Sequence, residues 1–268
     1  MSVRTGWRLR GASSVDIAQN APFTFTDKDI SHPVYRAGSG PAVILCHELT
    51  GLAPQCVAFA NELIGNGFTV YMPLLFGRFG QDSAAKGIIG ALCIARELGL
   101  FASGAERPLT AWLRALCAKA RRDCFCPGIG VIGMCITGNF AISLMADDIV
   151  LAPVASQPGL PAAITPGQAA AIGVTASELE AAKARAANGA ELMTLHFTND
   201  RVCPPARIHT LAAHFGGALT DIAVTSPDPA HGIKPNAHSV LTLDFCDQAG
   251  HPTRIARDQV IAFLRRKL

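Results

Sequence analysis

The chain has 268 residues, of which 50% are hydrophobic and 16% are charged, and its formal net charge is +3. This length and composition fit one domain with a sizeable core, so we expect a single domain over residues 1–268. The weak, interspersed charge argues against nucleic-acid binding, and no run of about 18 apolar residues predicts a membrane span. Residues 1–10 lack the apolar stretch of a signal peptide, and nine cysteines at irregular spacing favour reduced thiols, so we expect a cytoplasmic protein.

The first half of the chain alternates predicted strands with predicted helices. Residues 1–40 are expected to form an N-terminal extension with edge strands, since Phe23 and Phe25 alternate with threonines. Residues 74–90 form a long, glycine-spaced loop of the kind that lines a pocket. Continuous apolar runs predict buried strands at 42–46, 68–72 and just before Cys135, and helical patterns cover 54–66, 90–97, 107–121 and 137–145.

The second half of the chain continues this alternation. Strands are predicted at 148–154, 191–197 and 219–226, and helices at 177–188, 204–216 and 253–268. Ser177 is expected at or near a helix N-cap, and prolines mark the loops after residues 154 and 226. Repeated strand–helix units predict an α/β protein with a mostly parallel, doubly wound sheet and helices on both faces.

The stretch 131–140 carries the clearest chemical signal. An apolar strand leads into Gly133-Met134-Cys135, and the small residues around Gly138 begin a helix. Strand, sharp turn and helix are the geometry of a nucleophile elbow, in which glycines let the backbones approach closely. A cysteine in this position lies at a helix start, where backbone N–H groups favour the thiolate. The alternative interpretation is a buried structural cysteine at the end of a core strand.

Polar side chains follow several of the predicted parallel strands, at the edge where functional groups gather in such a sheet. The candidates are Glu48, Cys135, Asp200 and either His238 or His231. A thiolate can attack a carbonyl, a histidine can carry the proton, and a carboxylate can fix the tautomer of that histidine. Taken singly, Asp200 could be a helix N-cap and Glu48 a solvated carboxylate. Their joint position favours a catalytic site.

Acyl transfer also needs backbone N–H groups that hold the developing oxyanion. Ile136 follows the candidate nucleophile and supplies one N–H by its position. Leu49, which follows the first core strand, is the natural source of the second.

These segments resemble the dienelactone hydrolase family of α/β-hydrolases across most of the chain. The segment 47–52 is similar to the family's first-strand motif, Gly133-Met134-Cys135 to its elbow, and 200–204 to the segment that carries its triad aspartate. The resemblance implies an α/β-hydrolase fold and the opening of small esters or lactones through an acyl-thiol intermediate. It also implies that Glu48 interacts with the thiol in the resting enzyme and helps to generate the thiolate when substrate binds.

The resemblance also guides the choice of histidine. The spacing from His238 to the last helix is similar to that of the family's catalytic histidine, so we choose His238. His231 fits better only if the spacing is counted forward from Asp200, and His251 is a third candidate.

Three positions bear on substrate and packing. Arg78 matches one of the two arginines that bind the substrate carboxylate in dienelactone-cleaving members of the family. The second arginine would fall at Thr242, which cannot replace a bidentate guanidinium, so dienelactone itself is not expected to be the best substrate. Thr137 stands where the family usually has a second glycine, so the packing beside the elbow must differ.

The leading hypothesis is therefore a hydrolase of small esters or lactones with Cys135, His238, Asp200 and Glu48 in its site. We expect no metal or other cofactor, because Cys124 and Cys126 have no second Cys or His pair at zinc-ligand spacing. We expect a monomer or a small homo-oligomer. Two alternatives remain open: a thioesterase or xenobiotic carboxylesterase on the same site, and a non-hydrolytic redox or binding protein that keeps the fold and the thiol.

Overall fold

The computed structural model describes residues 16–80, 107–160 and 163–268. Its strands are β1 (Phe23–Asp27), β2 (Ile30–Gly38), β3 (Ala42–Cys46), β4 (Thr69–Pro73), β5 (Ile129–Met134), β6 (Val150–Ser156), β7 (Leu192–Phe197) and β8 (Leu219–Val224). They form one sheet in the order β1-β2-β4-β3-β5-β6-β7-β8. Strands β3 to β8 pair in parallel, whereas β1 and β2 are joined on antiparallel at one edge, as expected for edge strands.

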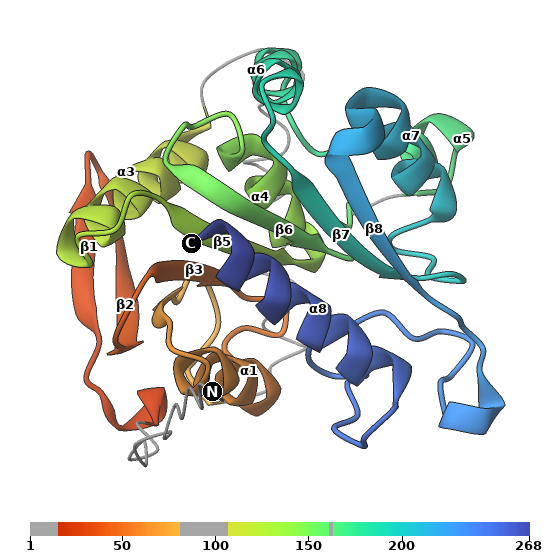
Figure 1. Cartoon of the computed structure of the whole chain (residues 1–268), viewed down its shortest axis with the longest axis horizontal. Coiled ribbons are helices and arrows are strands. Elements are labelled where there is room, and N and C mark those ends of the chain that lie inside the picture. Colours follow the sequence, from red (N-terminus) through yellow and green to blue (C-terminus); the bar gives the residue numbers. More distant parts are fainter. Residues whose placement is uncertain (1–15, 81–106, 161–162) are drawn as a thin grey trace, which may run out of the picture.

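Helices cover both faces of the sheet (Figure 1). They are α1 (Pro54–Gly65), α3 (Pro108–Asp123), α4 (Gly138–Leu144), α5 (Pro166–Ala170), α6 (Ala176–Ala187), α7 (Pro205–Phe215) and α8 (Pro252–Lys267), with short 3-10 turns η1 (Ile17–Gln19), η3 (Cys135–Thr137), η4 (Gly216–Ala218) and η5 (Pro229–His231). The predicted α/β architecture is confirmed. None of the helices that the structure describes is both long and apolar enough to span a membrane.

The central strands are buried on both faces, which explains why they appear in the sequence as unbroken apolar runs. All residues of β3 and β5 are buried. One core contains side chains from α1 and α8, such as Phe59 and Val260, and the other contains side chains from α3 and α4, such as Trp112 and Phe140. A parallel sheet covered in this way leaves its strand ends as the place where polar groups can meet.

Most predicted elements are found within a few residues of their expected bounds, and the exceptions have local causes. β6 begins at Val150 rather than at residue 148, because a turn closed by the Val150 N–H to Asp147 O bond precedes it. Thr175, not Ser177, is the N-cap of α6, and its hydroxyl forms a capping box with Glu178. Helix α5 was not predicted. The helix expected at 90–97 lies outside the described residues.

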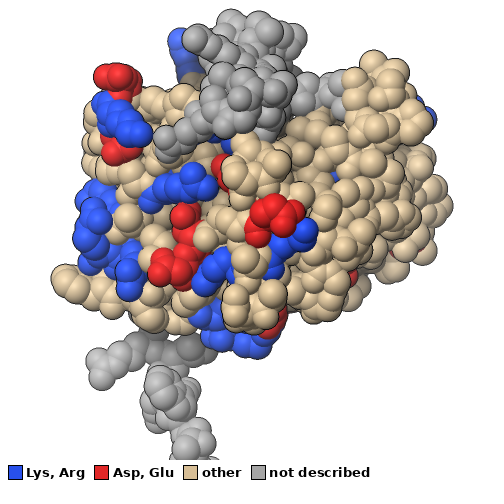
Figure 2. Space-filling model, turned by 90° about the horizontal axis from the view of Figure 1, so that it is seen from above, with Lys and Arg blue, Asp and Glu red and all other residues tan. Residues whose placement is uncertain are grey.

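Charged side chains are distributed as the sequence suggests. On the face shown in Figure 2, basic and acidic side chains lie next to one another rather than in a broad region of one sign.

Candidate active site

The chain turns sharply at Cys135, between β5 and α4. Cys135 has a φ of +57°, a left-handed conformation that is unusual for a residue with a side chain and typical of strained functional turns. A Cβ at Gly133 would lie 2.1 Å from Thr137 O, so only glycine allows the strand and the following turn to approach this closely. The Cys135 side chain is nearly buried, with 7% of the residue exposed.

Thr137 connects this turn to the end of β3. Its hydroxyl accepts a hydrogen bond from Met134 N at 2.9 Å and lies 3.1 Å from the carbonyl oxygens of Cys46 and His47, to which it can donate. The family's usual glycine has no hydroxyl for these contacts. Because Cys46 pairs with Gly133 in the sheet, the residues that follow each strand, Glu48 and Cys135, leave the sheet at the same edge.

Asp200 and His238 form a fixed pair at this edge. Oδ2 of Asp200 accepts from Nδ1 of His238 at 2.6 Å, while Oδ1 accepts from the backbone N–H groups of Val202 and Cys203 at 2.8 and 3.1 Å. The backbone of His238 is held separately, because its N–H donates to the Asp244 carboxylate at 2.9 Å. The imidazole ring therefore has one orientation, with Nε2 on the side away from Asp200.

Electrostatics couple His238 to the thiol of Cys135. Burial lowers the pKa of His238, but the hydrogen bond to Asp200 and the interaction with Cys135 raise it more, to about 11. Nε2 is buried and has no hydrogen-bond partner among the described residues, so the thiol acts on the ring without a full hydrogen bond. Catalytic hydrogen bonds are often long or poorly aligned in enzymes without bound substrate.

Glu48 is buried in the same site but is bound by residues that the sequence did not single out. Oε1 accepts from Gln157 Nε2 at 2.6 Å, and Oε2 accepts from Ser239 Oγ at 3.0 Å. Burial raises the pKa of Glu48, against the opposing effects of the His238 charge and of the Ser239 and Thr242 hydroxyls. Within the described residues, its carboxylate makes these two bonds rather than one to the Cys135 thiol.

Leu49 and Ile136 lie beside Cys135. Both side chains pack in one apolar cluster with the cysteine and with Phe76. The backbone N–H of Leu49 donates to no acceptor in the part of the chain that the structure describes, so it is available to a bound oxyanion. Arg78 lies two residues after Phe76 and is exposed, and its side chain makes no ion pair with another described residue.

His47 anchors the loop that carries Phe76. Its Nδ1 donates to Glu48 O at 2.7 Å and its Nε2 accepts from Leu75 N at 3.1 Å, so the buried ring is neutral. The ring also lies edge-on to Phe76, with 4.4 Å between ring centroids. Burial lowers the pKa of His47 to about 4.

This pKa predicts acid sensitivity. The unfolded chain takes up the His47 proton near pH 6.5 and the folded chain only near pH 4, so stability is lost as the pH falls through this window. From pH 7 to pH 5 the free energy of unfolding should fall by about 2 kcal/mol through His47. Urea unfolding at both pH values should show a smaller decrease in His47→Gln than in wild type. His209→Gln, at an exposed site on α7, is the control; equal decreases in all three would contradict the prediction.

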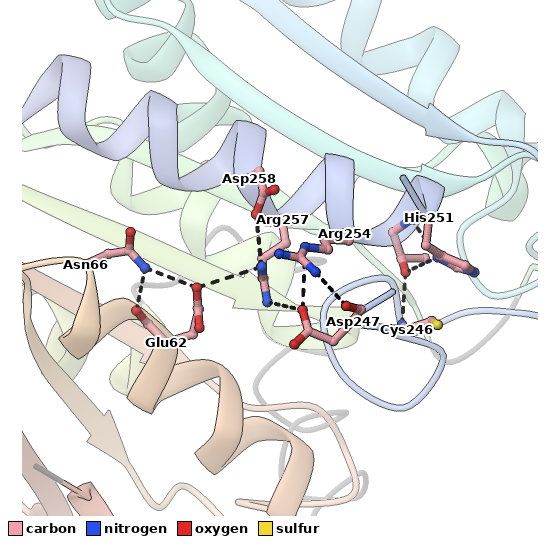
Figure 3. Close-up of polar contacts among 9 residues, drawn as sticks. Glu62, Asn66, Cys246, Asp247, His251, Arg254, Arg257 and Asp258 are labelled. Carbon is pink, nitrogen blue, oxygen red and sulfur yellow. Dashed lines mark hydrogen bonds and ion pairs between the residues drawn. The ribbon is translucent and has the colours of Figure 1, made fainter. Parts of the chain in front are cut away.

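The other candidate histidines lie together elsewhere. His231 Nδ1 bonds Asp228 Oδ2 at 2.6 Å, and its carbonyl is 3.0 Å from Nε2 of His251, which caps α8. The segment between His238 and α8 is fixed by buried Arg257, which pairs with Asp247, Asp258 and Glu62 (Figure 3). Within the described residues, His238 is thus the histidine that pairs with Asp200.

Sequence reasoning missed Gln157 and Ser239. Both stand where the strand-end argument would look, since Gln157 directly follows β6 and Ser239 follows His238. Neither is titratable, so neither suggested acid–base chemistry. The left-handed φ of +35° at Gln157 is visible only in the structure.

The mostly parallel sheet, the strained turn at Cys135 and the strand-end Asp200–His238 pair define an α/β-hydrolase fold. The model of the dienelactone hydrolase family matches residues 31–232, and the chain belongs to that family. A carboxymethylenebutenolidase from Pseudomonas sp. (strain P51) is 30% identical over 118 residues, which cover 41% of this chain and 46% of that protein, so the chain matches about half the length of this relative.

Solved structures agree on the fold. Est1E from Butyrivibrio proteoclasticus superimposes with a TM-score of 0.57 and 13% identity, covering 92% of this chain and 99% of that one. A dienelactone hydrolase-like promiscuous phosphotriesterase from metagenomic libraries gives a TM-score of 0.55 and 15% identity, covering 90% and 95%. At these identities the likeness establishes the architecture alone.

Proposed function

We propose that this chain hydrolyses small carboxylic esters or lactones with Cys135 as the nucleophile. The observation that carries the proposal is the orientation of His238: Asp200 occupies Nδ1, and Nε2 is left for the thiol on a strained turn. Family membership supports a hydrolase. The chemistry of a thiol, an imidazole and a carboxylate supports acyl transfer.

The reaction proceeds in two halves. His238 takes the thiol proton, the Cys135 sulfur bonds to the carbonyl carbon, and the backbone N–H groups of Leu49 and Ile136 hold the oxyanion. As the tetrahedral species collapses, the C–O bond breaks and His238 gives its proton to the departing alkoxide. His238 then deprotonates a water molecule that attacks the acyl-thiol, which releases the carboxylic acid and restores the thiol.

Glu48 is a positioning residue in this scheme. Its carboxylate holds Ser239, the neighbour of His238, and Gln157 at the end of β6, so it ties two segments of the site together. The charge of the His238 imidazole acts in turn on this carboxylate and opposes the rise that burial causes in the Glu48 pKa. Arg78 is exposed next to this site and is available to the carboxylate of an anionic substrate.

The test is turnover of p-nitrophenyl acetate by the purified chain. We expect repeated turnover near neutral pH, and complete inhibition after treatment with iodoacetamide, because alkylation removes the nucleophile. A protein whose Cys135 is alkylated readily but which turns over none of a panel of aryl esters, lactones and thioesters would be a non-hydrolytic thiol protein, and the proposal would be wrong.

A further inference from the structure

Outside the elbow itself, Gly159 is one of the residues that lie beside the Cys135 sulfur. It follows β6 by three positions, and its backbone is fixed on both sides: Gly159 N donates to Cys135 O at 3.0 Å, and Gly159 O accepts from Asn139 Nδ2 at 2.7 Å. Asn139 is fully buried. Gly159 is therefore held against the turn that presents the sulfur.

Gly159 packs so closely against its neighbours that it leaves no room for a side chain. A Cβ there would lie 3.4 Å from Cys135 Sγ and only 2.9 Å from Val202 Cγ1, which is closer than a Cβ normally packs. Gly159 does not have the positive φ that makes glycine obligatory for the backbone. Glycine is thus required here because a side chain would press on Val202 and the sulfur, and not because of an unusual backbone conformation.

Val202 lies against Gly159 on this side of the sulfur. It is an apolar residue with 40% exposure in the loop that directly follows Asp200. Its carbonyl accepts from Arg207 Nη1 at 2.7 Å, and the same nitrogen donates to Pro158 O at 3.0 Å. Arg207 is fully buried, so it links the segment before Gly159 to the segment that carries Val202 and fixes the distance between them.

Other neighbours of the sulfur, apart from the imidazole of His238, are apolar. Leu49, Ile136 and Phe76 pack around Cys135, and His47 fixes the Phe76 loop. A group bonded to the sulfur therefore meets a glycine, a valine and three large apolar side chains. Apolar side chains on these sides of the sulfur favour a short apolar acyl chain.

We propose that Gly159 and Val202 form an acyl subsite that selects esters with short, unbranched acyl groups. The inference rests on the proposed function and specifies its substrate class. The size limit comes from Gly159 and Val202 themselves, which lie against the sulfur and are held there by two buried polar side chains, Asn139 and Arg207. Gly159 and Val202 are specificity-determining residues that contact the acyl group but take no part in proton transfer.

The test compares p-nitrophenyl acetate with p-nitrophenyl butyrate. Wild type should prefer acetate in kcat/KM, and Gly159→Ala should increase that preference about tenfold or more, since a misfit of one methylene in a rigid apolar site is worth about 10–200-fold. Val202→Ala should change the ratio in the opposite direction. Gly217→Ala is the matched control, because a Cβ there meets nothing within 4 Å. A ratio that stays at the wild-type value in both Gly159→Ala and Val202→Ala would overturn the subsite.

A second measurement separates this inference from the proposed hydrolysis. The rates at which iodoacetamide and its bulkier N-phenyl derivative label Cys135 are followed by peptide mass. Gly159→Ala should slow the bulky reagent several-fold more than the small one. If no ester is hydrolysed but this selectivity is found, the hydrolase proposal is wrong and only the size limit that Gly159 and Val202 impose beside the sulfur stands. If esters are hydrolysed while neither ratio changes, the subsite is wrong and the function stands.

Discussion

Cys135→Ala is expected to reduce kcat/KM for p-nitrophenyl acetate by about 10⁴-fold or more, because no other group at the turn can form the acyl intermediate. The protein should remain folded. The substitution removes only Sγ, and alanine tolerates the left-handed conformation of the turn about as well as cysteine does. Circular dichroism and the urea midpoint check the fold, and initial rates of p-nitrophenolate release check the activity.

Cys246→Ala is the matched control for this substitution. Cys246 is a half-buried free thiol in the segment before α8, where its backbone N–H bonds Thr253 Oγ1 (Figure 3). Its removal should leave kcat/KM within about twofold of wild type, since surface changes away from a site have small effects. If Cys135→Ala keeps more than a tenth of the wild-type activity, the nucleophile has been misassigned.

Asp200→Asn is expected to reduce kcat/KM by about 10⁴-fold with little change in stability, by analogy with the same change in serine proteases. The asparagine carbonyl can keep the acceptor role of Oδ1 toward Val202 N and Cys203 N. Its NH₂ group then faces Nδ1 of His238, which must accept instead of donate. The ring proton moves to Nε2, and the imidazole can no longer take a proton from Cys135.

The control for this substitution is the same Asp→Asn change at the Asp228–His231 pair, which lies elsewhere and has the same Asp–His distance. Asp228 and His231 are also 2.6 Å apart, and the His231 side chain is 44% exposed. Asp228→Asn should therefore leave kcat/KM near the wild-type value. A large loss in Asp228→Asn together with a small loss in Asp200→Asn would assign the catalytic pair to His231.

The architecture could be predicted from the sequence because buried parallel strands appear there as continuous apolar runs. The apolar runs before His47 and Cys135 are β3 and β5, and the order of strands and helices requires their ends to lie at one edge. Glycine at 133 was also interpretable in physical terms, since the turn has no room for a Cβ. These features depend on local pattern and on the regular geometry of a parallel sheet.

The neutral parts of the site could not be predicted in the same way. The contacts of these residues depend on the direction of their side chains, and no spacing in the sequence encodes that direction. The residues are Gln157, Ser239 and Val202. Thr137 was recognised only as a departure from the family's glycine, whereas its hydroxyl bonds the turn to β3. Contacts between loops that follow different strands are tertiary contacts, so only the structure reveals them.

The central claim is that sulfur carries the acyl group during turnover. The most direct measurement is to mix the protein with p-nitrophenyl acetate, quench with acid during the first turnovers and map the peptides by mass. The account predicts one acetyl group on the peptide that contains Cys135, formed as p-nitrophenolate appears and lost as substrate is exhausted. Sustained turnover with no acetyl group on Cys135 at any time would contradict it.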